Sequence, residues 1–309
     1  MTAPLIFSVG TQVVVQKDTY HVNKRVAHPA GSVGVIVRSP IDRTHSYRVK
    51  FNDGFEAALH HDQLLRLSEF KRDHIRGSVE SSMINLNERV IYRCVIGSRA
   101  YGLSDDQSDT DRRGIYLPPA ELHWSLYGVP EQLENEKTQE AYWELQKFIV
   151  LALKANPNVL ECLYSPIVEF ATPLAEDLLA IREAFLSKLV FQTYSGYVAS
   201  QFKKMQTDIR NQGSVKWKHV MHLIRLLISG IDVLREGKVT VEVGQQRDPL
   251  LKIKRGELSF VEADAWRKRL QVEFEQAFQQ TTLPDRPDYE QVNAFLIHAR
   301  KLAIQKELP

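Results

Sequence analysis

Hydrophobic residues near the N-terminus occur in short runs separated by turn signals. Residues 11–15, 32–37 and 46–51 are rich in β-branched and aromatic residues, which favour strands. Asn-Asp-Gly at 52–54 follows the third run and is a strong hairpin signal. The pattern predicts a small all-β domain over residues 1–67.

The central part of the chain begins with an apolar run, residues 90–96, that is typical of a buried strand. Residues 120–138 are polar and are predicted to form a loop. A helix over 144–154 follows, and a second helix begins after Asn156, a good N-cap that precedes a proline suited to the first helical position. We expect a sheet covered by helices over residues 68–172.

The C-terminal part, residues 173–309, carries apolar residues at helical spacing. Ser259 and Glu262 form a capping-box pattern, Gly237 is predicted to end a helix, and residues 238–243 are predicted to form a short strand. The chain as a whole is therefore predicted to be an α+β protein of three domains. The predicted helices of the last domain cover residues 174–186, 190–209, 215–235, 259–279 and 288–304.

Composition is that of an ordinary folded protein: 43% of the 309 residues are hydrophobic and 25% are charged. The formal net charge of +2 excludes a surface that is basic throughout, so any affinity for nucleic acid must come from a local patch. Cys94 and Cys162 lie in apolar surroundings and are predicted to be reduced core residues. No apolar stretch reaches the roughly 18 residues of a membrane span, and the N-terminus lacks a secretory pattern, so we expect a cytoplasmic protein without membrane contact.

The strongest chemical signal follows the apolar run. The run stops at Gly97-Ser98, and two carboxylates, Asp109 and Asp111, then stand one residue apart. In a strand such residues point to the same face, where two like charges repel unless a cation lies between them. Mg²⁺ takes oxygen ligands of this kind, and a Gly-Ser turn offers backbone N–H groups to a phosphate. The segment indicates metal-assisted chemistry on a nucleoside triphosphate, with a solvated acidic loop as the plainer alternative.

The string Gly-Ser-x-Ala-Tyr-Gly-Leu from residue 97, with Ser-Asp-x-Asp-x-Arg-Gly from residue 108, resembles the signature of the polymerase-beta-type nucleotidyltransferase superfamily. Within it, the string is similar to a branch of bacterial and phage predicted nucleotidyltransferases associated with RNA repair. The resemblance implies a mixed catalytic sheet over 68–172 and a helical domain over 173–309 that closes the nucleotide cleft. It also implies two Mg²⁺ or Mn²⁺ ions and in-line transfer of a nucleoside monophosphate to a hydroxyl, with release of pyrophosphate.

The resemblance also implies a third carboxylate on a neighbouring strand, shortly before the Trp-Glu-Leu-Gln-Lys-Phe stretch at 143–148. The position that aligns with it is Gln139; Glu140 is adjacent, Glu136 lies just upstream, and Glu144 shares the strand parity of Glu140. We therefore expect Asp109, Asp111 and Glu140 to form the catalytic metal site. Without a third ligand, the site would bind nucleotide and catalyse poorly.

The turn and the second metal-binding strand supply the first nucleotide-binding candidates. Gly97, Ser98 and Arg99 are expected to hold the terminal phosphates through the turn. Arg113 follows Asp111 at alternate spacing, so it either points into the same cleft or forms a structural salt bridge with an aspartate.

A basic stripe on the predicted helix 215–235 supplies the other candidates. Lys218, His222 and Arg225 share one polar face of an otherwise apolar helix. A triphosphate needs cations besides the metal, so Lys218 and Arg225 are expected to grip the β- and γ-phosphates, and His222 to donate a hydrogen bond. The alternatives are an ordinary solvent face and a buried structural histidine.

The acceptor is the least constrained part of the prediction. The N-terminal domain resembles a tudor-like or KOW-like barrel, which could bind RNA or dock a protein partner. Together with the basic helices and the family association, it favours an RNA end as the acceptor, in RNA repair or processing. Nucleotidylation of a protein hydroxyl, as in antitoxins of the same superfamily, and a catalytically weak nucleotide- or RNA-binding adaptor are the alternatives.

Overall fold

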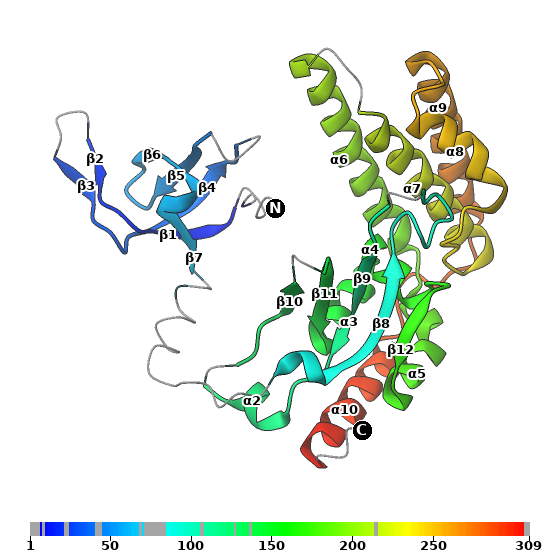
Figure 1. Cartoon of the computed structure of the whole chain (residues 1–309), viewed down its shortest axis with the longest axis horizontal. Helices are drawn as coiled ribbons and strands as arrows, with labels where there is room; N and C mark the ends of the chain where they lie inside the picture. The colour runs from blue at the N-terminus through cyan, green and yellow to red at the C-terminus, as the bar shows by residue number, and fades with distance from the viewer. Residues whose placement is uncertain are drawn as a thin grey trace. The chain divides into compact units, whose positions relative to one another are not determined.

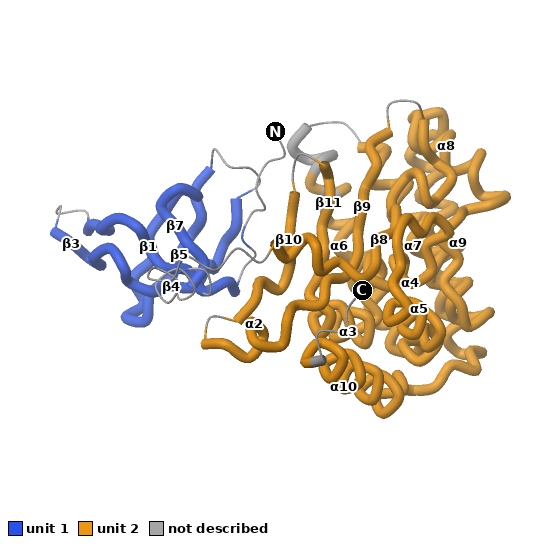
Figure 2. Tube along the Cα trace, turned by 60° about the horizontal axis from the view of Figure 1, so that its bottom comes forward, with its two compact units in different colours: residues 1–84 blue, residues 85–309 orange. Residues whose placement is uncertain are grey.

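The computed structural model describes residues 7, 10–21, 25–40, 45–67, 70, 85–105, 108–126, 128–135, 138–212 and 216–305. The chain forms two compact units, residues 1–84 and 85–309 (Figure 2). The expected boundary between a catalytic and a helical domain, at residue 172, lies inside the second unit, where sheet and helices share one hydrophobic core. That subdivision stays a prediction.

The first unit is built on a five-stranded antiparallel sheet with the order β6-β5-β4-β1-β7. The three predicted strands are present, and the predicted hairpin joins β5 to β6 through Gly54, whose φ is +88°. Whether the sheet closes as a tudor-like or KOW-like barrel stays a prediction. The strands are β1 (Gln12–Val15), β2 (Thr19–Tyr20), β3 (Val26–His28), β4 (Val33–Arg38), β5 (Tyr47–Phe51), β6 (Glu56–Leu59) and β7 (Leu64–Arg66); β2 and β3 form a separate hairpin, and a 3-10 turn, η1, covers His61–Gln63.

The second unit contains the mixed sheet, in the order β10-β11-β9-β8-β12. β9 and β11 pair in parallel and the other neighbours are antiparallel, so the predicted mixed sheet is present. Gly114 lets β8 and β9 approach closely, because a Cβ there would collide with the carbonyl oxygen of Tyr92. The strands are β8 (Val90–Ile96), β9 (Asp111–Tyr116), β10 (Gln132–Asn135), β11 (Glu140–Glu144) and β12 (Val168–Ala171), with the 3-10 turn η2 (Leu86–Arg89) before β8.

Two stretches differ from the sequence prediction. The segment 120–138, expected to be a loop, contains the helix α2 (Ala120–Trp124) and the strand β10, which forms by pairing with β11. Residues 238–243, expected to be a strand, pair with no other strand in the part of the chain that the structure describes. Val239 and Val241 are buried in the helical core, so their alternation reflects packing rather than a sheet.

Helices cover the sheet and continue beyond it. The helices α3, α4 and α5 pack against the sheet, whereas α6, α7, α8 and α9 pack on one another. The arrowhead of β8 points toward this second group (Figure 1). The helices are α3 (Leu145–Leu153), α4 (Pro157–Leu163), α5 (Pro173–Ala180), α6 (Leu189–Gln212), α7 (Trp217–Glu236), α8 (Arg247–Lys254), α9 (Phe260–Gln280) and α10 (Tyr289–Gln305), with η3 (Arg182–Phe185) and η4 (Gly244–Gln246) as short 3-10 turns.

The helix ends follow the sequence signals. Asn156 caps α4 by accepting from the N–H groups of residues 158 and 159, and Gly237 ends α7 with a φ of +68°. Ser259 and Glu262 form the predicted capping box of α9. Both cysteines are buried and free. Within the described ranges, no helix is long and apolar enough to cross a bilayer.

Candidate functional site

The turn after β8 and the start of β9 are in direct contact. Ile96 and Asp111 are paired residues of the two antiparallel strands, so the turn and the carboxylate lie at the same end of the hairpin. Gly97 has a φ of +74°, and a Cβ built on it would lie 2.7 Å from Oδ2 of Asp111. Glycine at 97 therefore allows both the turn conformation and the close approach of the carboxylate.

The turn presents unpaired donors next to this carboxylate. The amide of Tyr101 donates to the carbonyl of Gly97 at 3.0 Å, and the amide of Leu103 donates to that of Ser98 at 2.8 Å. Among the residues that the structure describes, the N–H groups of Ser98, Arg99 and Ala100 have no hydrogen-bond partner. The first amides of a helical turn are suited to bind a phosphate.

Gly97→Ala is expected to displace the Asp111 side chain and to strain the turn. Alanine would have to adopt the positive φ of this position, which is unfavourable for a residue with a side chain. Its methyl group would also occupy the space of Oδ2 of Asp111. We expect a loss of roughly 1–3 kcal/mol in unfolding free energy and weaker nucleotide binding. Denaturant unfolding measures the first effect and nucleotide titration the second. Gly128→Ala is the control, since its φ is +58° but no atom lies within 4 Å of its Cβ position. Equal nucleotide affinities of the two variants would contradict a role of the Gly97–Asp111 contact in nucleotide binding.

Asp109 and Arg113 flank Asp111. The Asp109 side chain is exposed and has no ion-pair or hydrogen-bond partner within the described ranges. Arg113 lies on the Asp111 side of β9, with Nη2 3.6 Å from Oδ1 of Asp111 and Nη1 donating to the carbonyl of Gln139 at 2.9 Å. Of the two roles foreseen for Arg113, the structure shows the salt bridge. Arg99 donates to the carbonyl of Ser108 at 2.9 Å and so ties the turn to the segment that leads to Asp109.

Glu140 does not lie on the same face of the sheet as Asp111. In the parallel pair of β9 and β11, Glu140 is level with Arg112, so its side chain belongs to the face opposite to that of Asp111. The hydroxyl of Tyr142, on that same face, donates to Glu140 at 3.1 Å. Among the described residues, no group of three His, Cys, Asp or Glu side chains is arranged to hold a metal ion. The structure thus differs from the expected three-carboxylate site. The residue beside Asp111 on the neighbouring chain segment is Gln139, which precedes β11.

Arg225 is buried rather than open to a phosphate. Its side chain on α7 is 8% exposed, and Nη1 lies 2.7 Å from Oε1 of Glu161 on α4. The guanidinium carbon is 3.7 Å from the ring centroid of Tyr101, whose hydroxyl donates to Oε2 of Glu161 at 2.6 Å. The structure therefore corrects the expectation that Arg225 grips a triphosphate. This buried triad anchors the 97–103 turn, through Tyr101, to α4 and α7. Sequence reasoning missed it, although a glutamate inside the apolar run of 157–163 was a signal.

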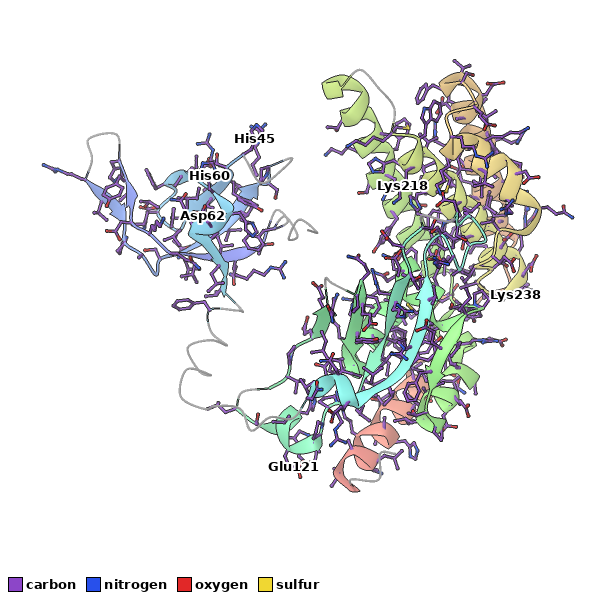
Figure 3. All side chains as sticks on the ribbon, viewed as in Figure 1. His45, His60, Asp62, Glu121, Lys218 and Lys238 are labelled. Carbon is purple, nitrogen blue, oxygen red and sulfur yellow. The ribbon has the colours of Figure 1, made fainter. Side chains whose placement is uncertain are left out.

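Lys218 lies in the first turn of α7, and Lys238 follows the glycine that ends this helix (Figure 3). Lys218 is exposed, and no ion-pair partner is present for it in the described part of the chain. His222, one turn further along α7, is half-buried. Burial first, and then the charges of Arg225 and Lys218, lower the pKa of His222 to about 4. His222 is therefore neutral at pH 7, and among the described residues of the predicted stripe Lys218 is the cation without an ion-pair partner.

The pKa of His222 predicts a loss of stability at mildly acidic pH. A histidine in the unfolded chain titrates near 6.5 and takes up protons as the pH falls, whereas folded His222 stays neutral until about pH 4. We expect this residue to remove roughly 2 kcal/mol of stability between pH 7 and pH 5. His222→Gln should flatten that part of the stability profile, measured by denaturant unfolding. A profile parallel to that of the wild type would contradict the prediction.

Three comparisons place the chain among known proteins. It is 31% identical to "Uncharacterized protein YcgL" of Bacillus subtilis over 146 residues, 46% of this chain and 55% of that protein. It is 27% identical to "Uncharacterized protein MJ0002" of Methanocaldococcus jannaschii over 154 residues, 48% and 61% of the two chains. The matches thus span less than two thirds of either relative. A crystal structure of a nucleotidyltransferase-like protein from Exiguobacterium sibiricum covers 75% of this chain and 79% of its own, with 16% identity and a TM-score of 0.25.

The family comparison covers most of the chain. The family model RlaP, described as the RNA repair pathway DNA polymerase beta family, matches residues 59–298. The match contains the complete mixed sheet, the 97–103 turn, Asp109 and Asp111. The chain therefore belongs to the RlaP family, the RNA repair pathway DNA polymerase beta family.

Proposed function

We propose that the chain transfers a nucleoside monophosphate from a nucleoside triphosphate to an acceptor hydroxyl, and that the acceptor is an RNA end. The observation that carries this proposal is the contact between Asp111 and Gly97, which sets a carboxylate beside a turn with unpaired amides. A carboxylate next to a phosphate-binding turn is what a metal–triphosphate complex requires.

The side chains fit a divalent cation without a third carboxylate. Mg²⁺ is commonly held by one or two carboxylates, with phosphate oxygens and waters completing its ligands. Asp109 has no partner among the residues that the structure describes and Asp111 is 36% exposed, so both retain oxygens for Mg²⁺ or Mn²⁺. A bound ion, or two, would neutralise charge on the triphosphate and lower the pKa of the acceptor hydroxyl.

The protein's own groups would bind and orient the reactants. The amides of Ser98, Arg99 and Ala100 would hold the terminal phosphates, and Arg113 would orient Asp111. Lys218, which pairs with no acid in the described part of the chain, would offer its charge to the triphosphate. In the reaction, the acceptor oxygen bonds to the α-phosphorus, the bond from that phosphorus to the bridging oxygen breaks, and pyrophosphate leaves. The proton of the acceptor hydroxyl passes to solvent.

A second candidate is a nucleotide-binding adaptor with little activity. Gln139 favours it, since the residue that the resemblance aligns with a third metal ligand carries no charge. The two functions differ in whether product forms.

Incubation with each α-labelled nucleoside triphosphate, Mg²⁺ or Mn²⁺ and a short single-stranded RNA tests the proposal. Transfer of label to the RNA supports it and identifies the nucleotide. Label on protein instead would assign a protein hydroxyl as the acceptor. Metal-dependent nucleotide binding without any transfer would favour the adaptor.

A further inference from the structure

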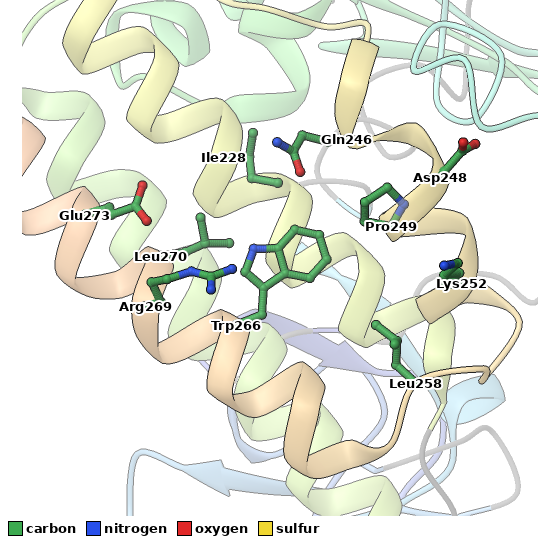
Figure 4. Close-up of a pocket in the computed structure, with 10 residues that line it drawn as sticks. All are labelled: Ile228, Gln246, Asp248, Pro249, Lys252, Leu258, Trp266, Arg269, Leu270 and Glu273. Carbon is green, nitrogen blue, oxygen red and sulfur yellow. The ribbon is translucent and has the colours of Figure 1, made fainter.

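A cavity of about 510 Å³ lies between α7, α8 and α9 (Figure 4). Its apolar part comes from all three helices and includes Ile228, Pro249 and Leu270. Trp266 of α9 lies in the middle of the lining residues, with Arg269 beside it (Figure 4). The cavity thus offers an aromatic ring, apolar walls and, from Gln246, a side-chain amide.

The charges around this cavity favour an anion. Its two acids each have an arginine nearby: Asp248 lies 3.5 Å from Arg247, and Glu273 lies 3.9 Å from Arg235. The two cations that line it, Lys252 on α8 and Arg269 on α9, are exposed and have no ion-pair partner among the residues that the structure describes. Two unpaired cations beside a half-buried tryptophan suit a ligand that carries both a phosphate and a flat ring.

One of the three helices that line the cavity, α8, also contacts the segment that follows β8. On α8, Nε of Arg247 donates to the carbonyl of Gly102 at 2.8 Å, and Nζ of Lys254 donates to Asp105 at 3.1 Å. Lys252, two residues before Lys254, lines the cavity instead. The cavity and the segment of residues 97–105 therefore lie on different sides of α8. They are separated by about the width of one helix, roughly 10–12 Å. A nucleic-acid strand bound in the cavity would be held close to the reacting groups.

We propose that this cavity binds one unpaired nucleotide of a single-stranded RNA, with the base stacked on Trp266 and the phosphate between Lys252 and Arg269. The inference rests on the proposed function, because it assigns the site that holds the acceptor RNA. Stacking on an aromatic side chain is tolerant of sequence, so the cavity selects for an unpaired base rather than for a particular one. A nucleotide inside a duplex cannot stack there, because the neighbouring base pairs cover both of its faces.

Fluorescence anisotropy with a short labelled oligouridylate and the full chain tests the site. Lys252→Ala and Arg269→Ala are each expected to weaken binding about three- to tenfold and to lower the salt dependence by roughly 0.7 per lost phosphate contact. Both side chains are exposed, so folding is unaffected. Lys268→Ala is the matched control, since Lys268 lies on the same helix but pairs with Asp264 at 2.9 Å. Trp266→Leu should weaken binding about tenfold, provided that circular dichroism shows the native fold.

Equal RNA affinity for Lys252→Ala, Arg269→Ala and the Lys268→Ala control would overturn the inference. Duplex RNA that binds as tightly as the single strand would overturn it as well. The same variants separate this inference from the proposed function. If label transfer persists but these cations do not affect RNA binding, only the cavity assignment fails. If RNA binding depends on them but no label is transferred, the cavity assignment stands and nucleotidyl transfer to RNA fails.

Discussion

Asp111→Asn is expected to reduce nucleotidyl transfer by more than about 100-fold. Loss of a partner that only supports a metal ligand already costs about 10–100-fold, and Asp111 is proposed as a direct ligand. The fold should persist, because this side chain is 36% exposed and its ion pair with Arg113 is 3.6 Å long. Initial rates of label transfer to RNA measure the effect, with circular dichroism as the check on folding.

Glu140→Gln is the matched comparison for Asp111→Asn. Both changes replace a carboxylate by an amide at the start of a strand, and the two strands are parallel neighbours. Because Glu140 belongs to the opposite face, its replacement should leave most of the activity. Equal losses of activity in the two variants would show that Glu140 is the third metal ligand. The register of β11 against β9 would then not exclude it from the metal site.

Arg225→Met is expected to have the largest effect on stability, a loss of about 3–5 kcal/mol in unfolding free energy. The change removes one partner of a buried ion pair and leaves the carboxylate of Glu161, which is 1% exposed, without its countercharge. Denaturant unfolding monitored by circular dichroism measures the loss. Adding Glu161→Gln to Arg225→Met should recover part of it, since the neutral amide no longer needs a cation.

Arg235→Met is the control on the same helix. Its side chain is 50% exposed and lies 3.9 Å from Glu273, a geometry that contributes within about 1 kcal/mol. Losses of similar size at 225 and 235 would contradict the buried triad as an anchor of the 97–103 turn.

Local patterns were sufficient for much of the fold. The helices α7, α9 and α10 follow from apolar spacing, and the ends of α4, α7 and α9 follow from capping residues. The proximity of Gly97 to Asp111 could also be inferred from the sequence, because the two residues lie at the same end of one strand pair. In each case the determining interactions are between residues close in sequence.

Other features depend on contacts between distant residues. Counting alternate positions within β11 could not give the face of Glu140, because that face is set by its register against β9. Helical periodicity placed Arg225 on a polar stripe, but only tertiary packing brings Glu161 and Tyr101 to it. The strand β10 likewise exists through its pairing with β11.

The central claim is that residues 97–99 of the turn after β8, together with Asp109 and Asp111, form one metal–triphosphate site. Calorimetric titration of a non-reactive nucleoside triphosphate analogue, with Mg²⁺ and with a chelator, tests it on the wild type and on Asp109→Asn/Asp111→Asn. We predict binding that requires Mg²⁺ in the wild type and falls at least about tenfold in the double variant. Affinity that is unchanged by the chelator or by the double substitution would contradict the claim.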